Sequence, residues 1–546
     1  MAKKRPAPPD HLVLELHAPG MSPLHRAGLG GLACTLKYIE RAYRDGQLDE
    51  DQLPGAPWPD DNPPWEIEPG RVTLYFGKPE GAQEYLKRLF DLAFQIQEDA
   101  IFLPGQYDLA PPSLPVRSLL QQGMTLTFLQ HGKVRSLDRK ETVLSYNPED
   151  KPEATIEIPH NRCAKYKHQQ GWKDLVDNQG RLKRGTFEVS GPMNPGAVVR
   201  HQAFTSSTRI EEDAAHVLAL YFALVGCLAL PVNRGCGVLL VPEVRDLEQF
   251  VFVRPLMTPT TVRDCQITSP GDAALQAQVR LRAKRESRQL DLPGFYTSIF
   301  QPTPWASQQK SRVLTMYVPP GDELTLSQFE KALEVLPPRV VVRVVKQTKG
   351  RGKKKEILEK KEWFWAKSVV LPLVADNLAQ GRRWYEGFTR LMIDLDPVSK
   401  TPIRDRLVFE KEGLNAMTRE IPWKEQGEST VVRAVHEAIR RRYARIAEEN
   451  KNNPVAMKNR WSGEYDRWRL AFAGAKTVDQ FRHALCDLFS RAGLNPVLQK
   501  EWEHILPMLS PQRWQLARDL ALLALASYTG SGSEELESTE EQQAVA

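Results

Sequence analysis

The sequence predicts an α+β protein: a mixed α/β N-terminal body with a basic β-hairpin, followed by a C-terminal all-α helical bundle. Three observations predict this fold class. Strand-like alternation and helical apolar spacing interleave through the first part of the chain. Two strand-like runs then flank a cluster of lysines, and the region before the C-terminal tail shows helical spacing only. The resulting divisions are a body at 1–335, a hairpin and linker region at 336–426, a helical bundle at 427–530 and an acidic, disordered tail at 531–546.

The body opens with a strand and a helix. Leucines alternate with other residues from 12 to 16, as in a half-buried strand. Ser22 then occupies the position of a helix N-cap and Pro23 the first helical position, so a helix should begin there. Further along, the patterns predict a strand at 71–76, a helix at 80–100, strands at 124–129 and 155–158, and a strand at 233–244 followed by a short helix capped by Asp246.

Glycines within the first helix indicate a close neighbour. Gly28, Gly30 and Gly31 each cost a helix about 0.5–1 kcal/mol relative to alanine. We therefore expect another backbone to approach closely, as when a helix packs on a sheet. A phosphate-binding loop is excluded, because the spacing matches neither the dinucleotide fingerprint nor a P-loop.

The composition limits the class of protein. Lys and Arg number 74 against 68 Asp and Glu, a mild excess that is compatible with nucleic-acid binding. The six cysteines form no C-x-x-C pair, so neither a zinc site nor a disulfide framework is indicated. The N-terminal segment lacks the apolar core of a secretory signal. The most apolar segment, 217–232, is 16 residues long and falls short of the roughly 20 that cross a membrane. We expect a cytoplasmic protein without a membrane partner.

The apolar segment 217–232 should belong to a core helix, and polar residues precede the start of that helix. Thr208 and Glu211 have the spacing of a capping box, which places the helix start near Ile210. A helix N-terminus preceded by hydroxyls and arginines suits a phosphate, although a simple helix cap is the alternative. The candidate ligands there are Arg200, His201, Ser206 and Arg209.

A basic segment lies at 160–184, where seven Lys/Arg face two Asp, with Tyr166 and Trp172 between them. Such a pattern suits a nucleic-acid backbone with stacked bases, and a solvated basic loop is the equal alternative. We take Arg162, Lys165 and Lys167 as candidate binding residues.

A second candidate segment, 294–314, is rich in aromatic residues and amides. Amide side chains read base edges, aromatic rings stack on unpaired bases, and cations hold phosphates. A loop that belongs to the core is the alternative. The candidates in this segment are Gln301, Trp305, Gln308, Gln309, Lys310 and Arg312.

The basic hairpin is predicted by two strands, 339–345 and 363–371. The ten residues that follow the first strand contain six cations and no acid, so we expect a loop that clamps a nucleic-acid backbone. A solubilising loop would more often mix its charges. The candidates are Lys346, Lys349, Arg351, Lys353, Lys354 and Lys355.

The C-terminal bundle should contain five helices joined by short loops. Thr477 and Gly493 mark the start and end of one helix, and Ser510, Pro511 and Gly530 those of the last. A basic face on the first helix holds three further candidates, Arg441, Arg442 and Arg445.

The segment 413–429 is polar and rich in helix breakers, as expected for a linker. Met417 lies within it. Translation that begins at Met417 would give a product of residues 417–546, which contains the whole bundle.

Catalytic constellations are sparse. Asp394 and Asp396 could bind Mg²⁺ in a nuclease, which is the alternative function, but an Asp-Pro after a strand is also ordinary turn chemistry. His17 and His25 could form an RNase-like pair, although His25 more simply packs in the first helical turn. No nucleophile elbow or metal-ligand spacing is present, so we expect neither enzymatic activity nor a cofactor.

Several segments together resemble the large subunit of type I-B CRISPR surveillance complexes (Cascade), of the kind also found in CRISPR-associated transposons. The segments are SPLHRAGLGGLA, PGAVVRHQAF, NRGCGVLLVPEV and GFYTSIFQPTPWASQQKSR, together with an α/β body followed by a helical bundle.

The resemblance implies a non-catalytic subunit of a guide-RNA complex that reads the protospacer-adjacent motif (PAM) and helps to open the target duplex. It implies as partners guide RNA, target double-stranded DNA, the other Cascade subunits, and a helicase-nuclease or a transposon-targeting protein. The bundle resembles the small subunit of such complexes, which related systems make by internal initiation.

Overall fold

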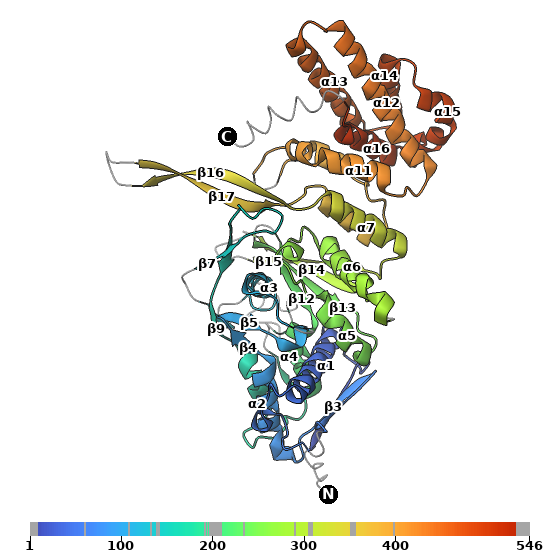
Figure 1. Ribbon diagram of the computed structural model, residues 1–546. Coiled ribbons are helices and arrows are strands. Elements are labelled where there is room, and N and C mark those ends of the chain that lie inside the picture. Colours follow the sequence, from blue (N-terminus) through green and yellow to red (C-terminus); the bar gives the residue numbers. More distant parts are fainter. Residues whose placement is uncertain are drawn as a thin grey trace, which may run out of the picture. The chain divides into compact units, whose positions relative to one another are not determined.

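The computed structural model describes residues 9–58, 62–107, 110–130, 134–137, 142–189, 193, 195, 210–232, 235–288, 291–303, 310–349, 356–396 and 399–530. The chain divides after Pro320 into two compact units (Figure 1). Strands and helices alternate in the first unit, and the second ends in helices only. The predicted α+β class is confirmed.

Two helices that cross closely form the centre of the first unit. They are α1 (Pro23–Arg44), which Ser22 caps as predicted, and α4 (Ala214–Gly226). A Cβ atom added at Gly28 would lie 1.9 Å from the carbonyl oxygen of Ala219, and one at Gly31 would lie 2.4 Å from that of Phe222. The close neighbour that the glycines predicted therefore exists, but it is a helix and not a sheet.

Two antiparallel sheets flank this pair of helices. The first has the strand order β1 (His11–Glu15), β3 (Arg71–Tyr75), β2 (Trp65–Glu68). The second runs β12 (Leu228–Pro231), β13 (Gly237–Pro242), β14 (Phe295–Thr303), β15 (Lys310–Val318). Since β12 and β13 are buried on both faces, they read as continuous apolar runs.

Further helices and short strand pairs complete the first unit. The helices are α2 (Ala82–Ala93), α3 (Leu114–Leu126), α5 (Leu247–Met257) and α6 (Pro270–Arg288), with short 3₁₀ turns at η4 (Pro104–Gln106) and η5 (Lys167–Asp174). The strand pairs are β4 (Gln95–Gln97) with β5 (Ala100–Phe102), β6 (Arg135–Leu137) with β9 (Cys163–Tyr166), β7 (Thr142–Tyr146) with β8 (Ile156–His160), and β10 (Phe187–Glu188) with β11 (Glu211–Glu212).

Three predictions for this unit are wrong. Residues 124–129 are not a strand but the end of α3 and the turn after it, and the helix predicted at 80–100 ends at Ala93. The core helix does not start near Ile210, because Asp213 accepts the hydrogen bond of the His216 N–H and caps α4 at Ala214. Thr208 lies outside the described residues.

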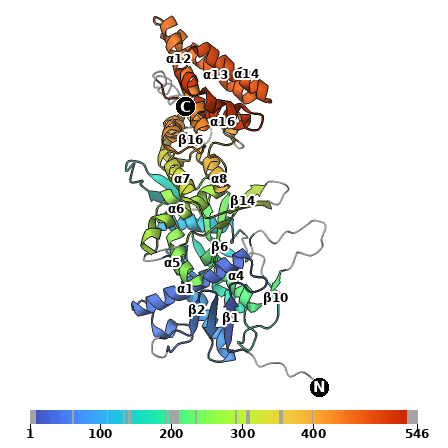
Figure 2. The same ribbon diagram turned by 90° about the vertical axis from the view of Figure 1, so that its right-hand side faces the viewer.

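The second unit begins with a helix, a hairpin and four further helices. These are α7 (Glu323–Val335), β16 (Arg339–Lys349), β17 (Glu356–Ala366), α8 (Leu371–Ala379), α9 (Thr389–Ile393), α10 (Arg404–Leu407) and α11 (Lys411–Glu420). Five helices follow: α12 (Gln426–Glu449), α13 (Pro454–Gly474), α14 (Val478–Ala492), α15 (Pro496–Ile505) and α16 (Trp514–Ser527). Figure 2 shows α12, α13, α14 and α16 gathered together.

Helix α16 is the core of this group. Residues 520–526 are buried on every side, and α16 contacts α12, α13 and α14. Thr477 and Gly493 bound α14 as predicted. The predicted ends of α16 are wrong: the helix begins at Trp514 instead of Pro511, and it ends three residues before Gly530.

The segment 413–429 is not an irregular linker. It holds most of α11 and the start of α12, and Leu414 and Met417 on α11 are completely buried. Within the described ranges, no helix combines the length and the apolar composition needed to cross a membrane.

Candidate nucleic-acid interface

The strongest candidate surface is the long antiparallel hairpin β16–β17 (Figure 1). Its strands pair in register over eleven residues each, from Arg339 opposite Ala366 to Lys349 opposite Glu356. The predicted hairpin is therefore present, but both strands extend further toward the turn than the sequence indicated, and β17 ends at Ala366 instead of residue 371. Lys346 and Lys349 lie in β16, whereas Arg351, Lys353, Lys354 and Lys355 lie outside the described residues.

The hairpin concentrates the positive charge of the whole chain. Residues 339–366 contain ten Lys/Arg and three Glu, an excess of seven. The entire chain has an excess of six, so the remaining residues together carry one more acid than base. A ribbon of this charge attracts a polyanion whatever its sequence.

The returning strand moderates this charge in a way that the sequence analysis missed. Lys346 pairs in register with Glu359, and Lys349 with Glu356. Arg343 donates two hydrogen bonds to Glu362, at 3.1 and 2.9 Å. Three of the four cations of β16 thus stand opposite an acid in the register, and the segment that joins the strands is the most positive part of the hairpin sequence.

An arginine and an aromatic ring of the hairpin were also missed. The Arg343 guanidinium lies 5.7 Å from the centre of the Phe364 ring, which is 40% exposed. An exposed ring beside a cation can stack on an unpaired base. The alternation along β17 contained this signal, since Phe364 stands between two tryptophans.

The basic segment at 160–184 is largely tied to neighbouring acids. Arg162 lies 3.4 Å from Asp99, and Lys167 lies 3.1 Å from Asp174. Lys165 is exposed on β9. Of the three candidates here, Arg162 and Lys165 are exposed and Lys167 is partly exposed.

The aromatic part of that segment does not fit base stacking as predicted. Tyr166 is buried, and its hydroxyl donates to the Gln95 carbonyl. The adjacent His168 is completely buried between Phe94 and Tyr221. Only Trp172, which has Lys173 5.5 Å from its ring, is partly exposed.

The segment 294–314 forms most of the hairpin β14–β15. Its register sets Gln301 opposite Arg312, and Thr303 opposite Lys310, next to the turn. Phe295 and Phe300, which we expected among the base-stacking rings, are buried core residues. The candidates Trp305, Gln308 and Gln309 lie outside the described residues, as do the side chains of Lys310 and Arg312.

The proposed phosphate ligands Arg200, His201, Ser206 and Arg209 also lie outside the described residues. The helix end that follows them differs from the prediction, because its cap is the carboxylate of Asp213, directly after Glu212. Two acids at this end weaken the case for a phosphate there.

On the first helix of the bundle, the three arginine candidates lie in different surroundings. Arg441 donates to Glu437 at 2.5 Å, and Arg445 donates to the Arg491 carbonyl. Arg442 is 14% exposed and paired with Glu464 at 2.6 Å. Arg442 therefore stabilises the packing of α12 against α13 and does not offer a free charge.

The residues considered for catalysis are also separated or engaged. Asp394 is exposed, whereas Asp396 is buried and accepts the hydrogen bond of the Ser399 N–H in a turn. His25 is buried against His216 and bonded to Ser22, and burial lowers its pKa to about 4. In the part of the chain that the structure describes, no three His, Cys, Asp or Glu side chains gather as a metal site.

Comparison with known proteins gives consistent matches. Residues 13–221 match the family described as the DevT N-terminal domain, and residues 419–545 match the DevT C-terminal domain. The chain is 34% identical over 560 residues to the CRISPR-associated protein Cas8a1/Csx13 of Myxococcus xanthus (strain DK1622). That similarity covers 98% of this chain and 92% of the relative.

Proposed function

The chain belongs to the Cas8a1/Csx13 family of CRISPR-associated proteins, and we propose that it is the large subunit of a type I CRISPR RNA-guided DNA-binding complex (Cascade). Its partners are then guide RNA, target double-stranded DNA and the other subunits of the complex, in the cytoplasm. The type I-B subtype and a transposon context, which the sequence motifs suggest, stay predictions because the matched relative carries neither designation.

The observation that carries the proposal is the charge of the hairpin β16–β17. An excess of seven positive charges on one ribbon suits the phosphates of a duplex or of a displaced strand. In RNA-guided complexes, base pairing with the guide reads the target, so the protein has only to read a short flanking motif and hold the backbone. The ribbon supplies backbone contacts of that kind.

We assign the reading of the flanking motif, or the contacts to the guide end, to 294–312, with help from 200–209. The amides Gln301, Gln308 and Gln309 have the chemistry to contact base edges, and Lys310 and Arg312 to contact phosphates. In this proposal the subunit opens the duplex without cutting it, and cleavage or insertion belongs to a recruited helicase-nuclease or transposon-targeting protein.

The test identifies the RNA that co-purifies with the protein and the DNA that the resulting complex binds. The tagged chain is expressed with its native neighbouring genes and captured, and the RNA that co-purifies is sequenced. We expect a short RNA of uniform length. The captured complex should then bind a duplex that matches this RNA, and only when a particular flanking motif is present.

Two results would overturn the proposal. One is capture of the chain without RNA or partner subunits from cells that transcribe the guide. The other is Mg²⁺-dependent cleavage of labelled DNA by the purified chain that disappears in Asp394→Ala, which would favour the nuclease alternative.

A further inference from the structure

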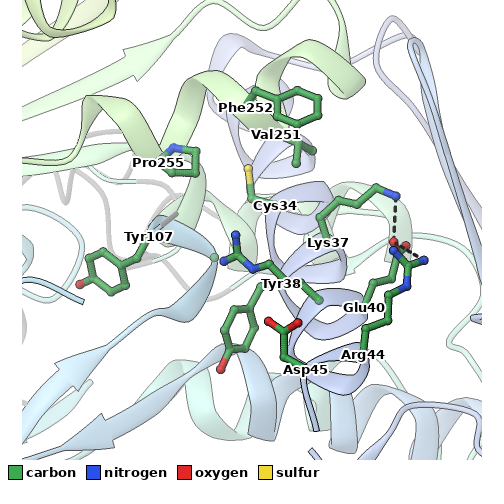
Figure 3. Close-up of a pocket in the computed structure, with 12 residues that line it drawn as sticks. Cys34, Lys37, Tyr38, Glu40, Arg44, Asp45, Tyr107, Val251, Phe252 and Pro255 are labelled. Carbon is green, nitrogen blue, oxygen red and sulfur yellow. Dashed lines mark hydrogen bonds and ion pairs between the residues drawn. The ribbon is translucent and has the colours of Figure 1, made fainter. Parts of the chain in front are cut away.

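A separate hollow lies in the first unit, between the last turns of α1, η4 and α5. Its volume is about 350 Å³, in the range of small-ligand sites. Figure 3 shows Cys34, Lys37 and Tyr38 of α1 on one side, and Val251, Phe252 and Pro255 of α5 on the other. None of the nucleic-acid candidates lines this hollow.

The α1 side of the hollow is cationic. Lys37, Arg41 and Arg44 line it, together with Glu40 and Asp45. Glu40 is engaged within the protein, because one carboxylate oxygen accepts from the Trp65 indole and the other faces Lys37 and Arg44, as the dashed lines in Figure 3 mark for the two cations. With Asp45 as the second acid, the α1 lining has three cations against two acids, a net charge of plus one.

A buried cation neighbours two lining residues, Pro255 in the sequence and Cys34 in space. Arg254, which precedes the lining residue Pro255, is completely buried and donates to the carbonyls of Val225 and Cys227 and to the Thr258 hydroxyl. Among the described residues no carboxylate contacts it, although a buried arginine ordinarily has an acidic partner.

The groups nearest to this buried cation stay neutral. Burial raises the pKa of the Cys34 thiol and of the Tyr107 hydroxyl to about 12 each, so neither supplies a negative charge at neutral pH. Within the described ranges, no negative charge therefore lies against Arg254. An anion in the hollow would compensate it from outside.

The α5 side offers a planar apolar surface. Phe252, which lines the hollow from α5, is 55% exposed. A guanidinium fork matches phosphate geometry, and an exposed aromatic ring stacks on a base. The hollow is too small for a folded partner segment but suits one ligand that has both groups.

We propose that this hollow binds a nucleotide, with its phosphate against Lys37, Arg41 and Arg44 and its base on Phe252. A free nucleotide and the terminal nucleotide of a strand share this chemistry. The inference concerns a different surface from the hairpin and does not depend on the proposed function.

The test is calorimetric titration of the purified full-length chain with the four ribonucleoside monophosphates, with the nucleosides and with inorganic phosphate. We expect at least one monophosphate to bind, and both fragments to bind at least about tenfold more weakly. Arg44→Gln and Phe252→Ala should each weaken binding about tenfold, the loss expected for one charge-assisted bond or one stacked base. Both side chains are largely exposed, so folding is preserved.

Matched controls are Arg71→Gln and Tyr75→Ala, which remove an ion-paired arginine and an exposed ring elsewhere in the unit and should leave the affinity unchanged. A ten-nucleotide RNA with or without a terminal phosphate distinguishes the two sources. If the RNA binds and the mononucleotides do not, and if Arg44→Gln and Phe252→Ala weaken the binding of the RNA, the ligand is the end of a strand. The proposal is overturned if no nucleotide or RNA binds in a manner that these two variants weaken, whatever the hairpin binds.

Discussion

Gly28 and Gly31 of α1 have no Cβ atom, and this allows α1 and α4 to approach closely. Alanine at Gly28 would place its Cβ 1.9 Å from the Ala219 oxygen, which is backbone and cannot move aside. Overpacking a core costs about 1–3 kcal/mol or more, against a helix-propensity gain of about 1 kcal/mol. We predict that Gly28→Ala lowers the thermal unfolding temperature of the protein.

The control for this prediction is Gly463→Ala in α13, where a Cβ meets nothing within 4 Å. There only the propensity gain acts, and the unfolding temperature should stay the same or rise. Equal effects of the two substitutions in differential scanning calorimetry would contradict the close packing of α1 on α4.

A buried histidine makes stability depend on pH. Burial lowers the pKa of His168 to about 3, and neither ring nitrogen has a hydrogen-bond partner among the described residues. In the unfolded chain this histidine has an ordinary pKa of about 6.5. Between about pH 3 and 6.5 it is therefore protonated in the unfolded chain and neutral in the folded protein. The contribution of His168 to the free energy of unfolding is therefore constant above about pH 6.5. Below that pH, the free energy of unfolding falls by about 1.4 kcal/mol per pH unit toward pH 3.

We predict that His168→Phe keeps the fold at pH 7, because Phe94, Tyr166 and Tyr221 surround the ring. It should also reduce the loss of unfolding temperature between pH 6.5 and 4.5. The control is His483→Phe at an exposed position. A pH profile that His168→Phe leaves unchanged would show that His168 is not buried in its neutral form.

At the scale of elements, the hairpin β16–β17 gives a prediction about salt. Changing Lys353, Lys354 and Lys355 to Gln removes three charges from the segment that joins the strands. If these lysines contact phosphates, the affinity for DNA should fall for every sequence. The slope of log affinity against log salt should become shallower by up to about 0.9 per lost contact.

The matched variant removes three exposed lysines, Lys451 and Lys476 in the connections between the terminal helices and Lys500 in α15, which changes the net charge by the same amount. Filter binding between about 50 and 200 mM salt compares the two variants. The same change of slope in both would mean that net charge, and not the hairpin, sets the affinity.

The helix boundaries show what local sequence signals can predict. Ser22 with Pro23, and Thr477 with Gly493, were identified correctly because each cap is made by neighbours in the chain. Thr208 and Asp213 both have capping chemistry, and the sequence does not tell which of them the tertiary structure uses. In 413–429 the spacing of Leu414, Met417 and Ile421 was helical, but the surrounding polar residues obscured it.

The candidate site shows the same limit. The charge of the hairpin could be counted from the sequence. The pairing of Arg442 with Glu464 and of Arg162 with Asp99 could not, because each partner lies on another element. Phe300 and Tyr166 read as stacking residues only while their burial was unknown.

At the scale of the whole molecule, helices beyond the predicted bundle share its core. Asn415 of α11 donates to the Ser527 carbonyl at the end of α16. The buried Asp519 of α16 accepts from the Gly387 and Thr389 N–H groups just before and at the start of α9, although burial raises the pKa of its carboxyl. Part of the region predicted as linker therefore stabilises the terminal helices.

This packing sharpens the prediction that translation also starts at Met417. The product, residues 417–546, would have 130 residues, would keep α12–α16 and would start close to the DevT C-terminal match at 419. It would lose Leu414 and Asn415, and with them a buried leucine and the bond to Ser527. The fragment 417–530 should therefore unfold at least about 4 °C below the fragment 411–530.

The measurement in cells uses the unmodified gene with a C-terminal tag. A short tagged product should vanish in Met417→Leu, a change that conserves volume at this buried position. Met457→Leu is the control, because a start inside α13 would lose α12 altogether and should not be the source. If neither the unmodified strain nor the Met457→Leu strain makes a short product, the bundle is used only as part of the full chain.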